Sequence, residues 1–180
     1  MGEGSGTTSD APLVLLSGGG GGARLAAGLS QSSAERPLLV VTNTGDDFEH
    51  CGLLICPDTD SVLYAVSKTI DRQRGWGRGE ESWAVFEELN NLGGPDWFQL
   101  GDKDLALHLA RAAMLSAGQG LASVTQALGN RLGAPSNVSV LPATESPVRT
   151  HVVTEQGTMA FQEYFVAHRC APVRQDAVYE

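Results

Sequence analysis

The 180-residue sequence contains no long apolar run and no long run of basic side chains. Lys and Arg number 12 against 21 Asp and Glu, which leaves a formal net charge of −9. A chain this acidic repels nucleic-acid phosphates and anionic lipid surfaces, so we expect no nucleic acid and no membrane as partners. Because no stretch has the apolar length of a signal peptide or a membrane span, we also expect a cytoplasmic protein.

Cysteine is scarce as well. Cys51, Cys56 and Cys170 are odd in number, which in a cytoplasmic chain predicts reduced thiols rather than disulfides. His50 lies beside the first of them, but the spacing matches no common zinc pattern. We therefore expect three small buried thiols and no zinc site.

The remaining composition is that of a folded protein. Hydrophobic residues make up 42% of the chain and charged residues 18%, and 180 residues are typical of one domain. Residues 1–11, MGEGSGTTSDA, offer nothing to bury and are predicted to be a disordered leader. Residues 12–180 are then expected to form a single domain.

The most informative stretch is LVLLSGGGGGARL at residues 13–25. An apolar run of strand length leads into five glycines and then into helix formers, which predicts a strand, a loop and a helix over residues 22–29. Such loops bring backbone N–H groups close to an anion, as phosphate sites do. Ala23, Arg24 and Leu25 stand where a P-loop needs Lys followed by Ser or Thr, so this is not a P-loop.

Two alternatives for the glycine run remain open. Gly18, Gly20 and Ala23 fit the dinucleotide-binding pattern, although five glycines satisfy several patterns trivially. A flexible linker is the other alternative, which the preceding strand argues against.

A second apolar run at residues 37–42 predicts a buried strand, so the chain opens as β-α-β. The right-handed crossover makes the two strands parallel and brings the loops after them to one edge of the sheet. We predict a Rossmann-like open parallel sheet with helices on both faces, and a small β-hairpin region towards the C-terminus.

Carboxylates cluster after the second strand. Asp46 and Asp47 follow it directly, and Asp58 and Asp60 precede an apolar-periodic segment at residues 62–70. The plain interpretation is a turn at the first pair and a helix cap at Asp58 or Thr59. Facing a phosphate loop, however, such carboxylates could together hold Mg²⁺ and leave positions open for phosphate oxygens.

The rest of the chain contains periodic segments separated by turn residues. The basic, glycine-rich residues 71–80 are expected to be a surface loop, and Trp97 and Phe98 to belong to the core. His108 is expected to be a packed or surface histidine rather than a base. Residues 161–169 are ambiguous between strand and helix, and residues 170–180 have little to fold around. The predicted helices are 82–92, 105–117 and 123–132, and the predicted strands 137–141, 151–154 and 158–162, the last two joined by a turn at 155–157.

Several separated strings together resemble one family, the 2-phospho-L-lactate transferases of coenzyme F420 biosynthesis and their phosphoenolpyruvyl-transferring relatives. The strings occur in order and cover nearly the whole chain after residue 12. They are SGGGGGARL at 17–25, VVTNTGDD at 40–47, ICPDTDSVLY at 55–64, GWG at 75–77, GGPDWFQLGDKDLALHLAR at 93–111, LPATESPVRT at 141–150 and MAFQEYFV at 159–166.

The resemblance implies a reaction. The terminal ribityl hydroxyl of a deazaflavin, Fo, attacks the β-phosphorus of guanosine diphosphate linked to lactate or enolpyruvate, and GMP leaves. Such a step needs positioned and neutralised phosphate oxygens, which Mg²⁺ and backbone amides can supply. The implied partners are therefore Fo and a guanylylated phospholactate or phosphoenolpyruvate. A homodimer is also considered.

Site residues follow from the resemblance by position. Asp60 matches an Asp that contacts the deazaflavin, and Gln99 matches a basic residue that does so. Asp46 and Asp47 are candidates for accepting the hydroxyl proton. The candidates for binding the metal are Asp46, Asp47 and Asp58. Candidate nucleotide and phosphate contacts are Ser17, Gly18, Gly19, Gly20, Gly21, Lys103 and Arg149.

The sequence also departs from the family pattern. Gly20 stands where the family usually has Thr, and Gln99 makes a neutral contact in place of a charged one. Residues 143–146, ATES, replace a typical Met-Ser-Asp-Asp string. Family members continue well beyond residue 180, so we expect an incomplete version of a longer domain, with exposed apolar edges.

Two other functions are compatible with these observations. One is a truncated paralogue that binds deazaflavin or nucleotide without catalysis. The other is a relative of the gluconeogenesis-factor proteins that bind nucleotide sugars, which the strings PDTD at 57–60 and DWFQLGDKD at 96–104 disfavour.

Overall fold

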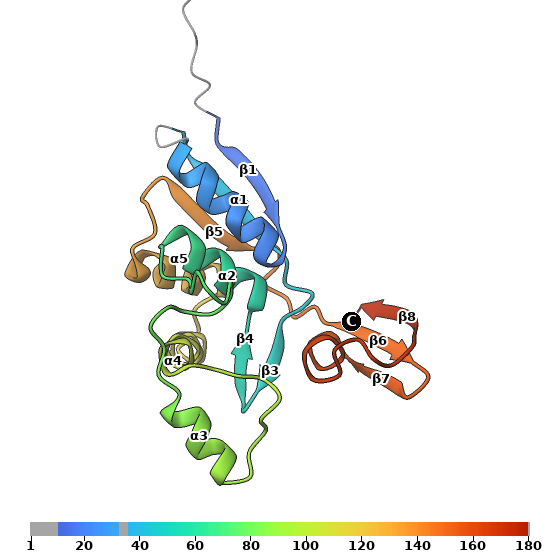
Figure 1. The fold of residues 1–180 in the computed structure, drawn as a ribbon. Helices are drawn as coiled ribbons and strands as arrows, with labels where there is room; N and C mark the ends of the chain where they lie inside the picture. Colours follow the sequence, from blue (N-terminus) through green and yellow to red (C-terminus); the bar gives the residue numbers. More distant parts are fainter. Residues whose placement is uncertain (1–10, 33–35, 180) are drawn as a thin grey trace, which may run out of the picture.

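The structure is a computed structural model that describes residues 11–32 and 36–179. Almost all of the predicted disordered leader lies outside these residues. The chain combines strands and helices and opens as β-α-β, as the sequence predicts for an α/β fold (Figure 1). Among the described helices, none combines the length and apolar character needed to cross a bilayer.

A three-stranded parallel sheet forms the N-terminal body. Its strands are β1 (Leu13–Ser17), β2 (Leu38–Thr42) and β5 (Val138–Pro142), in the order β1-β2-β5. Leu13 pairs with Leu38, and Leu38 pairs with Val138, so the three strands start level. The predicted β-α-β opening and its parallel strands are confirmed.

Helix α1 (Gly19–Ser32) connects the first two strands and begins three residues before the predicted start. Most of the glycine run is therefore helical rather than loop. Only Gly19 within the run has a positive φ, of 23°. Gly22 is required for a different reason, since a Cβ there would lie 2.2 Å from the Oγ of Ser17.

The main core lies between the sheet and helices on one of its faces. Ala23 and Ala26 of α1 pack with Val62 and Leu63 of α2 (Pro57–Val66) against the sheet. Helix α5 (Leu121–Leu132) contacts β5 on this same side, through Leu132. Small alanines on α1 allow the close contact of α1 with α2, which Figure 1 shows in front of the strands.

The opposite face of the sheet differs from the prediction. Val14 and Leu16 of the edge strand β1 are 54% and 78% exposed, and Leu39 and Val41 beside them are only half-buried. In residues 11–32 and 36–179, helices thus cover one face of the sheet and not both. The predicted exposed apolar edge is present, because β1 pairs with β2 alone.

The helices that follow start where tertiary contacts satisfy their N–H groups. Helix α2 is preceded by Cys56 as N-cap, so the predicted caps Asp58 and Thr59 lie inside its first turn instead. The remaining helices, α3 (Ala84–Asn91) and α4 (Asp102–Ser116), meet at Asp102. The Asp102 carboxylate accepts hydrogen bonds from the backbone amides of Ala84 and Val85. Helix α3 therefore begins at Ala84 and not at the predicted residue 82.

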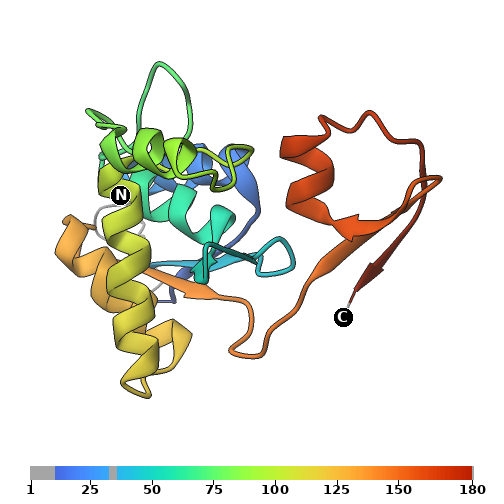
Figure 2. The ribbon, with the colours of Figure 1, turned by 90° about the horizontal axis from the view of Figure 1, so that it is seen from below.

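Two small antiparallel units complete the fold. A hairpin of β3 (Phe48–His50) and β4 (Leu53–Ile55), which the sequence did not predict, follows β2. The C-terminal sheet has the order β7-β6-β8 and stands beside the body in both views (Figure 2). It consists of β6 (Thr150–Thr154), β7 (Gly157–Ala160) and β8 (Arg174–Tyr179), with the π-helical turn η1 (Glu163–Ala167) between β7 and β8.

Predictions for this C-terminal region are mixed. The hairpin turn is confirmed, with Gly157 at a φ of 119°. Residues 174–179 were expected to lack structure but pair with β6, because backbone pairing does not require an apolar pattern. The cysteine prediction is also corrected, since only Cys56 is buried while Cys51 and Cys170 are exposed.

Candidate phosphate loop and ring cavity

The glycine loop and Asp58 meet at the carboxyl end of the sheet. A Cβ on Gly18 or Gly19 would lie 3.5 or 3.6 Å from the two carboxylate oxygens of Asp58. Asn43, at the end of β2, donates from Nδ2 to Asp58 Oδ2 at 3.0 Å. The start of α1 therefore lies next to a carboxylate that comes from α2. At Gly20 a Cβ would meet no atom within 4 Å, so the threonine usual in the resembling family would fit.

Asp46 lies near enough to Asp58 to be affected by its charge. Burial raises the pKa of Asp46 and the charge of Asp58 raises it further, while a hydrogen bond with Thr150 lowers it. The described residues contain no group of three or more His, Cys, Asp or Glu side chains arranged to hold a metal ion. Two carboxylates with phosphate oxygens and waters are nevertheless an ordinary Mg²⁺ site. Asp46 and Asp58 could therefore hold such a metal only together with ligands from a substrate or water.

Asp47 occupies a different environment from its neighbour. It is 4% exposed, and its Oδ1 has no hydrogen-bond partner among the described residues. Burial raises the pKa of Asp47 to about 7, while a hydrogen bond with Cys56 and the charge of Arg149 act to lower this pKa. Burial also raises the pKa of the Cys56 thiol, so this cysteine is a poor nucleophile.

Arg149, a predicted phosphate contact, lies near Asp47. Both line two cavities, of about 310 and 350 Å³, beside the loop that follows β2. Lys103 is placed elsewhere, at the start of α4, where its Nζ donates to the carbonyl of Gly79 at 3.3 Å. A second contact of Lys103, with Glu80 at 3.8 Å, is an exposed ion pair.

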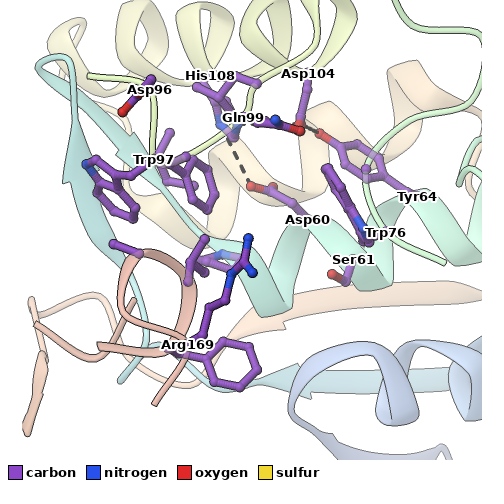
Figure 3. Close-up of a pocket in the computed structure, with 18 residues that line it drawn as sticks. Asp60, Ser61, Tyr64, Trp76, Asp96, Trp97, Gln99, Asp104, His108 and Arg169 are labelled. Atoms are coloured by element: carbon purple, nitrogen blue, oxygen red, sulfur yellow. Dashed lines mark hydrogen bonds and ion pairs between the residues drawn. The ribbon is translucent and has the colours of Figure 1, made fainter. Parts of the chain in front are cut away.

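The largest cavity described, about 870 Å³, brings Asp60 and Gln99 together as predicted. Figure 3 shows Asp60 on α2 facing His108 on α4, and Arg169 entering from the C-terminal segment. Aromatic rings form much of the wall. They are Tyr64, Trp76, Trp97, Phe98 and Phe165. An enclosure of flat apolar walls with carboxylates at its base is suited to a planar ring that carries N–H donors.

Three of these rings were assigned other roles from the sequence. Trp97 and Phe98 do contact core residues, because Phe48 packs on both at centroid distances of 5.7 and 4.9 Å. They serve the core and the cavity wall at once. Trp76 comes from the loop expected at the surface. The Arg74 guanidinium lies 5.1 Å from the centre of the Trp76 ring and 4.9 Å from the centre of the Trp83 ring, and so holds Trp76 in place.

A buried polar network beneath the cavity was missed in the sequence. Arg111 is fully buried and pairs with both carboxylate oxygens of Asp60. Its Nη1 also bonds to Nδ1 of His108 at 3.0 Å. The expectation of a packed His108 is confirmed, but its partners were not foreseen. The spacing i, i+4, i+7 of Asp104, His108 and Arg111 on one face of α4 was the available signal.

Asp104 and Tyr64 continue this network along the cavity wall. The Tyr64 hydroxyl donates to Asp104 Oδ1, and His108 Nε2 lies 3.4 Å from the same oxygen. Burial, the largest influence, acts to raise the pKa of Asp104, but interactions with His108 and Tyr64 outweigh it and the pKa is lowered. Burial raises the pKa of Tyr64 well above its usual value, which keeps its hydroxyl a donor.

Comparison with known proteins identifies the family. The model of the family described as 2-phospho-L-lactate transferase CofD matches residues 13–180. The chain belongs to this family. The resemblance noted in the sequence is thereby confirmed, and so is its α/β fold class with a parallel sheet and a C-terminal hairpin region.

Curated members of the CofD family extend beyond the matched part. A phosphoenolpyruvate transferase of Streptomyces coelicolor is 43% identical over 171 residues, which are 92% of this chain and 53% of that protein. One from Kitasatospora aureofaciens is 45% identical over 160 residues, 86% of this chain and 49% of that protein. The chain thus spans about half the length of the curated relatives it matches.

A solved structure shows the same fold at greater distance. A UPF0052 family protein from Bacillus halodurans is similar with a TM-score of 0.55 and 18% identity. The match covers 93% of this CofD family chain and 50% of that one. It supports the fold alone.

Proposed function

We propose that this chain takes part in transferring a phosphoenolpyruvyl or phospholactyl group from a guanosine diphosphate-linked donor to the ribityl hydroxyl of Fo, with release of GMP. The curated relatives are named phosphoenolpyruvate transferases, which favours the enolpyruvyl donor. The glycine loop would bind the diphosphate, and the aromatic cavity would bind the deazaflavin ring.

One observation carries the proposal. The first turn of α2 presents Asp58 to the glycine loop and Asp60 to the ring cavity. Asp58 and Asp60 are two residues apart on α2, so their side chains point in clearly different directions. The first turn of α2 therefore separates the glycine loop from the ring cavity. A substrate with a ring and a flexible ribityl chain could then occupy the cavity and extend its hydroxyl towards the phosphates.

The residues at the phosphate side have complementary roles in this proposal. Asp46 and Asp58 would hold Mg²⁺, which when bound neutralises the phosphate oxygens of the donor. Asp47 offers the unpartnered Oδ1 and would accept the hydroxyl proton. Arg149, beside Asp47, would contact a phosphate oxygen, whereas Lys103 would need to release its bond to Gly79 to do so.

Fluorescence titration with Fo tests the proposal. We expect the chain to bind Fo saturably, and Asp60→Ala to weaken binding because the ring loses its acceptor. Asp176→Ala, an exposed carboxylate on β8, is the matched control and should bind as the unmodified chain does. A turnover assay with the guanylylated donor, Fo and Mg²⁺ then measures GMP release.

The outcomes separate the candidate functions. Binding with GMP release supports the transferase. Binding without turnover, at saturating donor and Mg²⁺, supports the alternative of a deazaflavin-binding module. Absence of Fo binding by a folded chain would contradict both.

A further inference from the structure

Arg111 is the feature that the proposed reaction leaves unexplained. Its side chain is fully buried on α4, far from any exposed phosphate-binding role. Taking a guanidinium out of water costs several kcal/mol, and apolar residues of similar volume often replace buried ion pairs without loss of stability. Stability alone is therefore a weak reason for an arginine here.

The contacts of Arg111 converge on Asp60. Nη2 bonds to Asp60 Oδ1, and Nη1 lies 3.2 Å from Asp60 Oδ2. This fork fixes the plane of the carboxylate in a way that a single donor could not. Each carboxylate oxygen has a second lone pair. Those not used by Arg111 remain available to a donor in the cavity that Asp60 lines.

Arg111 also determines which nitrogen of His108 carries the proton. A guanidinium has donors only, so the 3.0 Å contact requires His108 Nδ1 to be the acceptor. The ring proton is then on Nε2, which faces Asp104 Oδ1 at 3.4 Å. Asp60, His108 and Asp104 all line the cavity, so one buried side chain sets the donor and acceptor pattern at its base (Figure 3).

We infer that Arg111 is a positioning residue for the ring substrate, which presents Asp60 as an oriented acceptor and holds His108 as the Nε2-protonated tautomer. The inference rests on the proposed function, because the ring substrate is Fo. Arg111 itself does not contact the substrate. It acts through the two side chains that line the cavity.

A double-mutant cycle on Fo affinity tests this in the full chain. The variants are Asp60→Asn, Arg111→Met and the two combined, with Arg131→Met as the control on an exposed arginine of α5. Arg111→Lys keeps the charge but not the fork, and it replaces Arg111→Met in the cycle if the latter does not fold. Circular dichroism and thermal unfolding confirm folding of each variant before titration.

We expect Arg111→Met to weaken Fo binding about 10- to 100-fold, by analogy with the loss on removing groups that orient metal-binding side chains. In the Asp60→Asn background the same change should cost much less, because Arg111 then has no carboxylate to orient. Losses that simply add would indicate a general structural role and overturn the inference, as would unchanged affinity in folded Arg111→Met.

Nitrogen NMR of the histidine ring gives a readout that does not depend on Fo. The unmodified chain should show His108 with an unprotonated Nδ1 and a protonated Nε2, and Arg111→Met should lose this tautomer preference. The opposite tautomer in the unmodified chain would overturn the inference. Failure of the unmodified chain to bind Fo would instead overturn the proposed function, and the inference with it, so Fo binding by the unmodified chain distinguishes the two failures.

Discussion

Asp47→Asn should make the protein more stable at neutral pH while it removes the proposed proton acceptor. Burial raises the pKa of Asp47 from 3.8 to about 7, so the folded state holds this proton more tightly than the unfolded state does. Stability consequently falls as the pH rises from about 4 to about 7, where the folded protein must lose the proton. Asparagine has no proton to lose, and its contribution stays constant across this range.

The magnitude follows from the same pKa. A tenfold change in proton affinity corresponds to about 1.4 kcal/mol, so the shift of Asp47 corresponds to at most about 4 kcal/mol. The free energy of unfolding of Asp47→Asn, minus that of the unmodified chain, should therefore increase by up to ~4 kcal/mol between pH 4 and pH 8. The groups facing Asp47 are Cys56, Asp60, Arg111 and Arg149, and all of them remain in the variant.

Urea unfolding at pH 4, 6 and 8, in EDTA to exclude metal ions, measures this difference. Asp96→Asn is the matched control, because Asp96 is exposed and should show the pH dependence of the unmodified chain. Stability curves of Asp47→Asn and the unmodified chain that stay parallel from pH 4 to 8 would refute the reasoning. In the turnover assay the same variant should lose activity about 10²- to 10⁴-fold, as expected for a proton acceptor.

Two further predictions concern the start of the chain. Gly22→Ala should destabilise the protein by about 1–3 kcal/mol in thermal unfolding, because the new Cβ would lie 2.2 Å from Ser17 Oγ. Gly21→Ala is the matched control. Its Cβ would meet no atom within 4 Å, so it should be neutral or stabilising by up to about 1 kcal/mol. Equal effects of the two would contradict this packing. Leu16→Glu should change the free energy of unfolding by less than about 0.5 kcal/mol, since Leu16 is 78% exposed, and should reduce any self-association seen by light scattering. A large loss of stability in that variant would show that the face is covered.

Local patterns were sufficient for the regular part of the fold. Apolar runs of strand length around a helical segment predict β1, α1 and β2, and glycines at positive φ mark the ends of α3, α4 and α5. These features depend on neighbours within a few residues. The sequence of β8 has no apolar run that would predict a strand. It pairs with β6 through backbone hydrogen bonds, which do not require a particular side-chain pattern.

The candidate site divides in the same way. Position in the sequence was enough to predict that Asp60 and Gln99 share a site, and to suspect the glycine loop and its carboxylates. The metal, the nucleotide contacts and the proton acceptor stay predictions that the experiments above would test. Sequence spacing alone did not separate Asp46 from Asp47, although their surroundings differ.

The sequence by itself determined the α/β opening, the family resemblance and the residues worth examining, because these depend on local periodicity and on motifs. Only the tertiary structure decided that Asp58 and Asp60 face different sites, that Arg111 is buried against Asp60, and that one face of the sheet is exposed. Burial and charge pairing arise between segments distant along the chain. Asp60 and Arg111 are 51 positions apart in the sequence, and nothing local signals their contact.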